Sequence, residues 1–252
     1  MAAKEFSEEH VIPYYEGDMT NHITLEMLVN ILVLASGDQN NQLGVDQSTV
    51  IDKYGLGWVV TSYSIKIKRL PKVDSKVEIF TKGTSFNKYF AFRQFWIKDL
   101  KGNVLVSADS IWVLMDEKTR RIAEIPQAVI SPYGSQEVKR IPKLPRPLKI
   151  KGDAKIISKQ YQVRYNDIDL NGHVNNTRYF DWMTDVLGMQ FLNTHQPTQI
   201  DIRFEDEVRY GDIVESRVMI SNLDDGSVQT VNDIQVANKT VTNATIVWKK
   251  LN

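Results

Sequence analysis

The chain has 252 residues, of which 42% are hydrophobic and 25% charged, a balance typical of a globular protein. Basic and acidic residues number 31 each, so the formal net charge is zero and we expect no nucleic-acid partner. The absence of cysteine excludes disulfides, cysteine-ligated zinc and a cysteine nucleophile. No apolar run approaches the ~18 residues that cross a bilayer, and the polar start of the chain does not resemble a secretion signal. We therefore expect a cytoplasmic protein without membrane insertion.

Each half of the chain contains a short polar turn followed by an apolar helix. In the first half the turn covers residues 16–22, and the apolar stretch after it predicts a helix over residues 24–36. This helix is apolar on almost all sides, which indicates burial. In the second half the turn covers residues 166–173, and a helix is predicted over residues 175–192.

A segment rich in proline and basic residues separates the two halves. Pro142, Pro145 and Pro147 suppress helix formation there, and the surrounding lysines and arginines are accompanied by no acid. Such a composition favours an extended linker. We predict an N-terminal domain over residues 1–137, a linker over 138–158 and a C-terminal domain over 159–252.

The strand-like segments of the two halves match each other, which indicates an internal duplication. The matching positions lie about 136 residues apart and include Ile65 with Ile200, Ile67 with Ile202, and residues 107–113 with 243–249. A helix followed by several antiparallel strands favours a sheet wrapped around that helix, and a second copy can pair with its open edge. We predict an α+β fold with two antiparallel sheets, each wrapped around a long central helix and together forming a continuous sheet.

The densest polar cluster of the chain, residues 164–179, lies directly before the second predicted helix. Backbone N–H groups at a helix start favour a developing negative charge such as an oxyanion. Asp167, Asp169 and Asn171 also match the opening of a calcium-binding EF-hand loop. That loop requires glutamate at its twelfth position, where this chain has Arg178, so we expect no calcium site.

Aspartate and asparagine before a helix also serve as caps and turn formers. A histidine in such a turn is often only a hydrogen-bonding residue. The residue types alone therefore leave this cluster open between turn chemistry and an active site.

Residues 167–179 read Asp-Ile-Asp-Leu-Asn-Gly-His-Val-Asn-Asn-Thr-Arg-Tyr. This stretch resembles the Asp-x-Asn-x-His-Val-Asn-Asn-x-x-Tyr signature of the acyl-ACP thioesterases, a family of plant plastids and bacteria. Residues 57–83 and 110–126 also resemble that family, so the resemblance covers nearly the whole chain. It implies a tandem double hot-dog fold, which agrees with the duplication. It also implies a thiolester hydrolase that releases free fatty acid from acyl carrier protein (ACP), with no cofactor and no metal.

The resemblance implies four catalytic residues. The aspartate, asparagine and histidine of the family signature correspond to Asp169, Asn171 and His173. A glutamate followed by cysteine on a later strand of the family corresponds to Glu207 and Val208, although Glu205 lies two residues away and would share its face. Valine has no nucleophile, so a carboxylate must do the work that an older proposal gave to the cysteine.

We expect Glu207 or Asp169 to activate water as a general base. Asn171 and the backbone N–H groups near Val174 and Asn175 would hold the carbonyl oxygen, and His173 would contact a carboxylate or the leaving sulfur. Direct attack by Asp169 with formation of an acyl anhydride is the competing version.

The first half repeats part of this pattern with Asp18 and His22 at the same spacing, but Thr20 replaces the asparagine. We expect Lys72 where the second acid would be, so this copy is predicted to be inactive. The resemblance implies that this half houses the acyl chain. Its apolar helix would line the acyl tunnel with Met27, Ile31 and Leu34, although such residues are also ordinary core residues.

The expected partner is acyl-ACP, which the basic residues 139–151, or Lys66, Lys68, Arg69 and Lys72, could contact. Two other functions stay open, an acyl-coenzyme A thioesterase and a non-hydrolytic acyl-binding protein, and a hot-dog dehydratase is a weaker third. Because a duplicated hot dog already contains the usual pairing of two domains, we expect a monomer or a homodimer.

Overall fold

The computed structural model describes residues 2–151 and 155–251. Strands are its main regular secondary structure, and they join into one 12-stranded sheet. The strands of the first half are β1 (Glu5–Val11), β2 (Leu56–Ile67), β3 (Lys76–Phe86), β4 (Ala91–Asp99), β5 (Val104–Asp116), β6 (Ile122–Ala123) and β7 (Gln136–Glu137). Those of the second half are β8 (Ile156–Gln162), β9 (His195–Phe204), β10 (Ile213–Asn222), β11 (Val228–Val236) and β12 (Lys239–Lys250).

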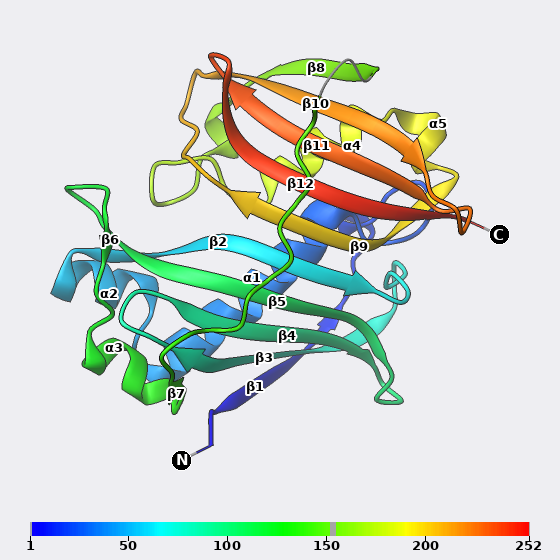
Figure 1. The fold of residues 1–252 in the computed structure, drawn as a ribbon. Helices are drawn as coiled ribbons and strands as arrows, with labels where there is room; N and C mark the ends of the chain where they lie inside the picture. The colour runs from blue at the N-terminus through cyan, green and yellow to red at the C-terminus, as the bar shows by residue number, and fades with distance from the viewer. Residues whose placement is uncertain (1, 152–154, 252) are drawn as a thin grey trace.

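The order of the strands in the sheet is the same when read from either edge. It runs β1-β3-β4-β5-β2-β9-β12-β11-β10-β8, so each of the five first-half strands on this path has a counterpart in the second half, whereas the two-residue strands β6 and β7 lie off the path (Figure 1). The neighbours in this order are antiparallel, and only the short β7 pairs in parallel, with β3. The expected antiparallel sheets are thus present as two mirrored halves of a single sheet.

The two halves join through β2 and β9, which are themselves equivalent strands. Ile65 of β2 pairs with Ile200 of β9, and Tyr63 pairs with Ile202. A strand that pairs antiparallel with its own copy is the arrangement found at the interface of a two-fold symmetric dimer. The join therefore removes the open edge that each half would otherwise expose, and the predicted continuous sheet is confirmed.

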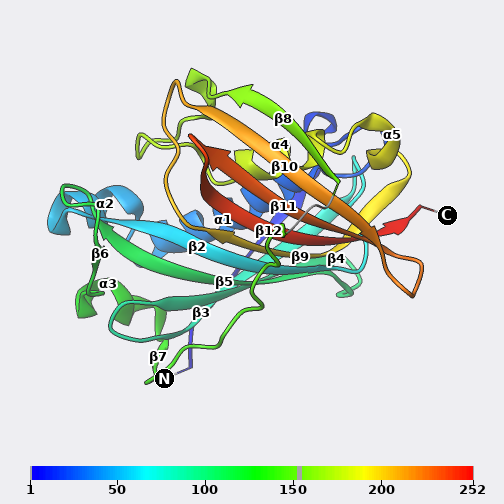
Figure 2. The same cartoon turned by 45° about the horizontal axis from the view of Figure 1, so that its top comes forward.

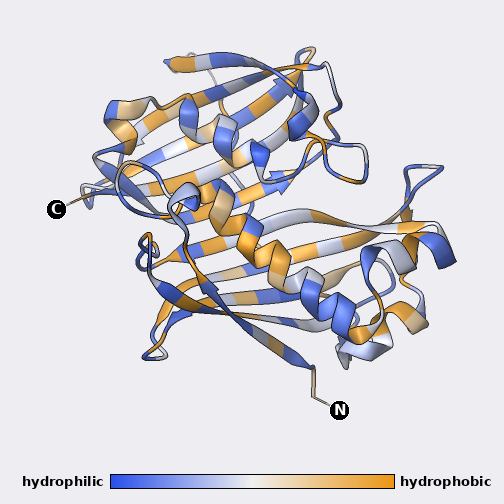
Figure 3. Ribbon diagram, turned by 180° about the vertical axis from the view of Figure 1, so that it is seen from behind, coloured by the Kyte–Doolittle hydropathy of each residue, from blue (hydrophilic) through white to orange (hydrophobic). Residues whose placement is uncertain are grey.

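Helix α1 (Leu25–Leu43) lies along one face of the sheet (Figure 3). Thr24 caps its first turn, because the Thr24 hydroxyl accepts a hydrogen bond from the Met27 backbone N–H at 3.2 Å. Gly44 ends it in the left-handed conformation, with φ of 69°. The helix extends seven residues beyond the predicted end at residue 36 (43 − 36 = 7). Gly44 is the first residue after the helix start that adopts the left-handed conformation, whereas Gly37 stays helical.

The second long helix was predicted wrongly, because its region contains two short helices. Helix α4 (Arg178–Asp185) is followed by α5 (Met189–Leu192). Between them, Gly188 adopts φ of 81° and ψ of 158°, a conformation almost restricted to glycine that no helix can continue. The apolar pattern across residues 175–192 suggested one helix, but a glycine in the middle of it divides the segment.

The segment after β7 runs over the face of the sheet opposite to α1 (Figures 1 and 2). Residues 141–151 have no regular secondary structure, as the prolines predict. The backbone N–H of Leu148 donates to the hydroxyl of Thr245 on β12 at 2.8 Å, so the segment contacts the second half of the sheet. Strand β8 begins at Ile156, inside the predicted linker over 138–158.

One hydrophobic core spans both halves of the sheet. Fully buried residues from α1, β2, α4 and β9 belong to the same cluster, among them Leu28, Ile65, Phe180 and Ile202. A smaller cluster lies under α2 (Gln47–Tyr54) and α3 (Gln127–Ile130) and includes Val50 and Val129. The shared core indicates that the halves fold as one unit.

We predict that Gly188→Ala lowers the free energy of unfolding by about 1–3 kcal/mol, because a side chain disfavours its backbone conformation. The matched control is Gly37→Ala within α1, where an added Cβ meets no atom within 4 Å. That change should stabilise the protein by about 0.5–1 kcal/mol. Urea unfolding of both variants checks this, and equal effects of the two substitutions would contradict it.

Candidate active site

The polar cluster of the second half forms a tight turn that projects from the end of β8 toward α4. The backbone N–H of Asp169 donates to the carbonyl of His173 at 2.8 Å, and Ile168 and Val174 form a β-bridge. Gly172 makes the reversal possible with φ of 76°. The turn thereby brings the Asp169 carboxylate and the His173 imidazole to one end of the structure.

A second segment brings Glu207 to this turn. The Val174 backbone N–H donates to the Val208 carbonyl at 2.9 Å, which fixes the loop after β9 against the turn. His173 Nε2 and Glu207 Oε2 are 2.9 Å apart, and their side chains are only 17% and 27% exposed. Glu205 and Glu207 lie in the loop after β9 rather than on the expected strand. Glu205 points elsewhere and pairs with Arg203 at 3.5 Å.

Tyr179 of α4 lies buried beside this pair. Burial, and to a smaller extent the charge of Glu207, raises the pKa of Tyr179 above its ordinary value. The Tyr179 phenol therefore stays neutral. Its ring packs edge-on against the ring of Phe204, with the two ring centroids 5.3 Å apart.

Asp169 and Asn171 contact each other within the turn. Asp169 Oδ1 accepts from the Asn171 backbone N–H at 2.8 Å, a typical turn contact. Asp169 Oδ2 receives only a long contact of 3.4 Å from the Asn171 side-chain amide. One carboxylate oxygen of Asp169 is thus left with weak protein contacts.

The first half of the chain supplies a residue that orients Asn171. Gln47, at the start of α2, donates from Nε2 to Asn171 Oδ1 at 3.2 Å. Its own Oε1 accepts from the Trp58 backbone N–H at 3.1 Å, which fixes the amide orientation. With its oxygen held by Gln47, Asn171 directs its NH₂ group away from Gln47 and toward Asp169.

The first half also supplies Arg120, from the turn between β5 and β6. The Arg120 guanidinium forms an ion pair with Glu207 Oε1, while its Nη1 contacts Glu117 Oε2 at 2.8 Å. Arg120 adopts φ of 54°, which is rare for a residue other than glycine and costs of order 1–3 kcal/mol. The Asp116 carboxylate holds this turn by accepting from the Thr119 backbone N–H at 2.6 Å, which lowers the pKa of Asp116.

Gly57 on β2 leaves room for these contacts. A Cβ at this position would lie 2.3 Å from Glu117 Oε1 and 3.0 Å from Gln47 Nε2. The sequence pattern did not indicate Gln47 or Arg120, because both are distant along the chain from the polar cluster. The only available signal was that Arg120 lies in the segment 110–126, which resembles the thioesterase family.

The expected substrate contacts of Val174 and Asn175 need correction. Their backbone N–H groups donate to the carbonyls of Val208 and Asp167 at 2.9 and 2.8 Å. Helix α4 begins only at Arg178, so neither N–H group belongs to a free helix start. Both groups are therefore already satisfied and do not hold a carbonyl oxygen.

The three residues expected to line an acyl tunnel lie in different environments. Ile31 is 2% exposed and belongs to the main core, Met27 is partly buried against it, and Leu34 is 51% exposed. The structure does not bring them together around a cavity.

The turn in the first half has the same backbone structure as the candidate site. The Asp18 N–H donates to the His22 carbonyl at 2.9 Å, and the Ile23 N–H donates to the Pro71 carbonyl at 3.0 Å. Ile23 and Pro71 correspond to Val174 and Val208, so the equivalent of Glu207 is the buried Leu70. The prediction that Lys72 occupies this position is wrong. This copy has no second acid beside its histidine.

In the part of the chain that the structure describes, no group of three or more histidine, aspartate or glutamate side chains could hold a metal ion. Among the same residues, no helix is both long and apolar enough to cross a membrane.

Comparison with known proteins agrees with this geometry. Residues 3–133 match the N-terminal domain of acyl-ACP thioesterases and residues 150–250 match the C-terminal domain. A sheet wrapped around a helix is the hot-dog architecture of these enzymes. The chain belongs to the acyl-ACP thioesterase family, which confirms the resemblance found in the sequence.

Individual relatives come from plants and bacteria. The chain is 29% identical over 223 residues to the chloroplastic acyl-[acyl-carrier-protein] hydrolase FATB3 of Cuphea viscosissima, covering 84% of this chain and 54% of that protein. It is 27% identical to the chloroplastic oleoyl-acyl carrier protein thioesterase 2 of Arabidopsis thaliana, covering 84% of this chain and 62% of that one. The chain thus spans little more than half the length of these plant relatives.

Solved structures give a similar result. A putative oleoyl thioesterase from Lactobacillus plantarum is 44% identical and superposes with a TM-score of 0.95, covering 99% of this chain and 98% of that one. The 12:0-ACP thioesterase from Umbellularia californica shares the fold at 21% identity and a TM-score of 0.84, covering 98% of this chain and 94% of that one.

Proposed function

We propose that this protein hydrolyses the fatty acyl thioester of acyl-ACP, releasing free fatty acid and the carrier protein. The observation that carries the proposal is the 2.9 Å contact between His173 and Glu207 beside Asp169 and Asn171, within a chain of the acyl-ACP thioesterase family. Two carboxylates, an imidazole and an amide are sufficient for a thioester, which is already activated toward attack by water.

The contacts divide the roles among these residues. Both oxygens of Glu207 are engaged, with His173 and with Arg120, so Glu207 orients the imidazole. Asp169 keeps an oxygen with only a 3.4 Å contact, so it removes a proton from the attacking water. The Asn171 amide donates to the carbonyl oxygen as negative charge develops there.

The reaction then balances as follows. The water oxygen bonds to the carbonyl carbon, Asp169 takes the water proton, and the carbon–sulfur bond breaks. The thiolate that leaves receives a proton from His173, and the proton taken up by Asp169 is then returned to His173, so both groups regain their starting state. Direct attack by Asp169 to form an acyl anhydride is the alternative, and label that enters the Asp169 carboxylate during single turnover in H₂¹⁸O would establish it. Label only in the fatty acid arises from attack of water on the thioester and also from an anhydride opened at its acyl carbonyl, so trapping of an acyl-enzyme with hydroxylamine separates these two.

We further propose that the mirrored halves are two hot-dog domains, with the N-terminal one, residues 1–137, receiving the acyl chain. Residues 138–158 connect it to the domain over 159–252, which carries the polar turn. We expect a cytoplasmic monomer or homodimer. Matched acyl-ACP and acyl-coenzyme A substrates separate the two carriers, and a higher kcat/KM for acyl-coenzyme A would contradict the assignment of ACP.

Asp169→Asn and Glu207→Gln should each lower kcat on acyl-ACP by about 10²–10⁴-fold, because the first removes the general base and the second removes the carboxylate that orients the His173 imidazole. The matched control is Glu205→Gln, two residues from Glu207 but 38% exposed and paired with Arg203. It should retain activity close to the unaltered protein. A loss below tenfold in both active-site variants, with folding intact by circular dichroism, would contradict the assignment.

Arg120→Met should lower kcat by about 10- to 100-fold with little change in KM, because Glu207 and His173 lose the group that fixes their geometry. Arg120→Lys should recover part of the loss by restoring the charge. The neighbouring Arg121 is exposed, so Arg121→Met is the control and should leave kcat unchanged. Equal kinetics of the two methionine variants would show that Arg120 has no positioning role.

A further inference from the structure

An ion pair joins the two halves of the chain at the start of their helices. Arg178 Nη1, in the first turn of α4, lies 2.8 Å from Glu26 Oε1, in the first turn of α1. The two side chains are only 28% and 17% exposed. Burial raises the pKa of Glu26, and the charge of Arg178 opposes this shift, so Arg178 favours the ionised carboxylate. Arg120 with Glu207 is a second ion pair between the halves.

The same arginine contacts the base of the turn that carries Asp169 and His173. Arg178 Nε lies 3.6 Å from Asp167 Oδ1, and the Asp167 side chain is 1% exposed. The backbone carbonyl of Asp167 accepts from the Asn175 N–H at 2.8 Å, which closes the loop around Asp169 and His173. Arg178 therefore connects α1 of the first half to the residues that enclose this turn.

Asp167 has a second cationic partner, but it is far more exposed. Arg164 Nη2 lies 3.0 Å from Asp167 Oδ1, and the Arg164 side chain is 67% exposed. Exposed ion pairs contribute little, whereas removing one partner of a buried pair leaves the other charge uncompensated. We therefore expect loss of Arg178 to disturb Asp167 more than loss of Arg164.

The copy of this turn in the first half lacks the arginine. The two turns match at an offset of 151 residues (169 − 18 = 151), which places Met27 at the position of Arg178 and Glu16 at the position of Asp167. Glu16 is 5% exposed and pairs with His10 of its own half at 2.8 Å. The arginine thus belongs only to the copy that also has an acid beside its histidine.

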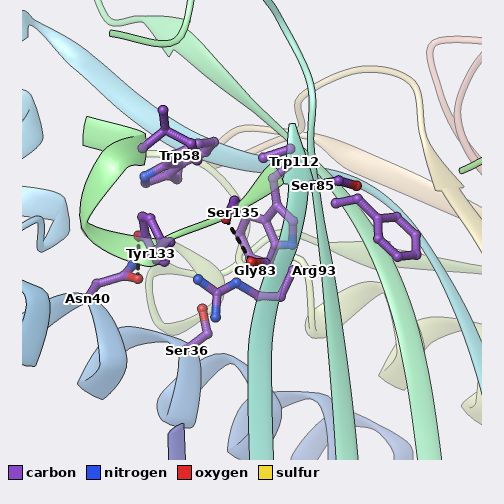
Figure 4. Close-up of a pocket in the computed structure, with 12 residues that line it drawn as sticks. Ser36, Asn40, Trp58, Gly83, Ser85, Arg93, Trp112, Tyr133 and Ser135 are labelled. Atoms are coloured by element: carbon purple, nitrogen blue, oxygen red, sulfur yellow. Dashed lines mark hydrogen bonds between the residues drawn. The ribbon is translucent and has the colours of Figure 1, made fainter. Parts of the chain in front are cut away.

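Burial alone does not make an arginine a link between the halves. Arg93 of β4 is 7% exposed and lines a pocket in the first half (Figure 4). Its Nη1 donates to Gln39 at 2.6 Å and to Thr81 at 2.9 Å, and both of these neutral residues belong to the same half. Arg178 differs because it contacts a carboxylate of each half.

We propose that Arg178 is a positioning residue for thioester hydrolysis, and that Glu26 of the first half acts on the reaction through it. Held between Glu26 and Asp167, the guanidinium fixes the turn relative to α1, and the turn fixes Asp169 and His173 relative to the thioester. Loss of this contact leaves the substrate-binding groups in place but lets the reacting groups shift, which slows the chemical step. This inference rests on the proposed thioesterase function.

Arg178→Met gives α4 the residue type that the first-half copy has at this position. The change should lower kcat on acyl-ACP by about 10- to 100-fold and alter KM by less than about threefold, because it affects the geometry of reaction more than substrate binding. Arg178→Lys should recover part of the loss, since its ammonium group can still pair with a carboxylate. Steady-state kinetics on one acyl-ACP measures both variants.

Arg217→Met is the matched control. The Arg217 side chain is 26% exposed and pairs at 2.6 Å with Asp233, which is 6% exposed, so this ion pair resembles that of Arg178 in burial. It connects β10 to β11 within the second half. Arg217→Met should therefore lower the free energy of unfolding in urea, as Arg178→Met does, but leave kcat unchanged.

Glu26→Gln tests whether the first half acts through the arginine. Alone it should lower kcat by about 3- to 10-fold, and combined with Arg178→Met it should cause no further loss, because residues that act through one contact are not additive. Two independent effects would instead multiply.

The outcomes separate this inference from the proposed function. A kcat of Arg178→Met within about twofold of the unaltered protein overturns the inference, as does an equal loss in Arg217→Met. Multiplied losses in the double variant overturn the part assigned to Glu26. If Arg178→Met does not fold, unchanged kcat in both Arg178→Lys and Glu26→Gln overturns the inference. In each of these cases the unaltered protein still hydrolyses acyl-ACP, whereas absence of hydrolysis by the unaltered protein overturns the thioesterase function itself.

Discussion

The pairing of β2 with β9 is the contact on which the rest of the structure depends. Each half has a strand edge that would otherwise stay unpaired, and the two edges satisfy each other where Ile65 faces its own copy, Ile200. This join places the loops at the end of β5 and the start of α2 beside the polar turn of the second half. Gln47 and Arg120 can reach Asn171 and Glu207 only because of it. The candidate active site is therefore a product of both halves, although its motif lies entirely in one.

Much of the fold could be predicted from the sequence, because repeated patterns carry the information. The offset between matching strand segments indicated the duplication, and the apolar stretch after residue 24 indicated α1. The second helix was predicted wrongly, since an apolar pattern continues across Gly188 although its backbone conformation cannot be helical. The start of β8 was missed, because exposed residues 156–160 lack the alternation that marks a half-buried strand.

The candidate site was predictable to the extent that its residues are close together in the chain. Asp169, Asn171 and His173 form one local turn, and Glu207 was selected over Glu205 by resemblance and not by physical argument. The backbone hydrogen bonds of Val174 and Asn175 were not predictable, because they depend on how the loop after β9 packs against the turn. Arg120 and Gln47 were missed for the same reason. Their importance comes from tertiary contacts or from burial, and neither is visible in a local pattern.

The mirrored strand order has a further consequence for the segment that connects the halves. The chain leaves the sheet from β7, which pairs with the side of β3 opposite to β4 and so lies level with β1, the first strand in the order. It re-enters at β8, tenth in the order, and must cross nine strand spacings (10 − 1 = 9). At about 4.8 Å per spacing this is roughly 43 Å, whereas the 18 residues from 138 to 155 (155 − 138 + 1 = 18) reach at most about 60 Å when fully extended. Lengthening this crossing is geometrically harmless, but losing more than about a quarter of it would leave it taut. Evolutionary shortening of the connection is therefore limited by the width of the sheet itself.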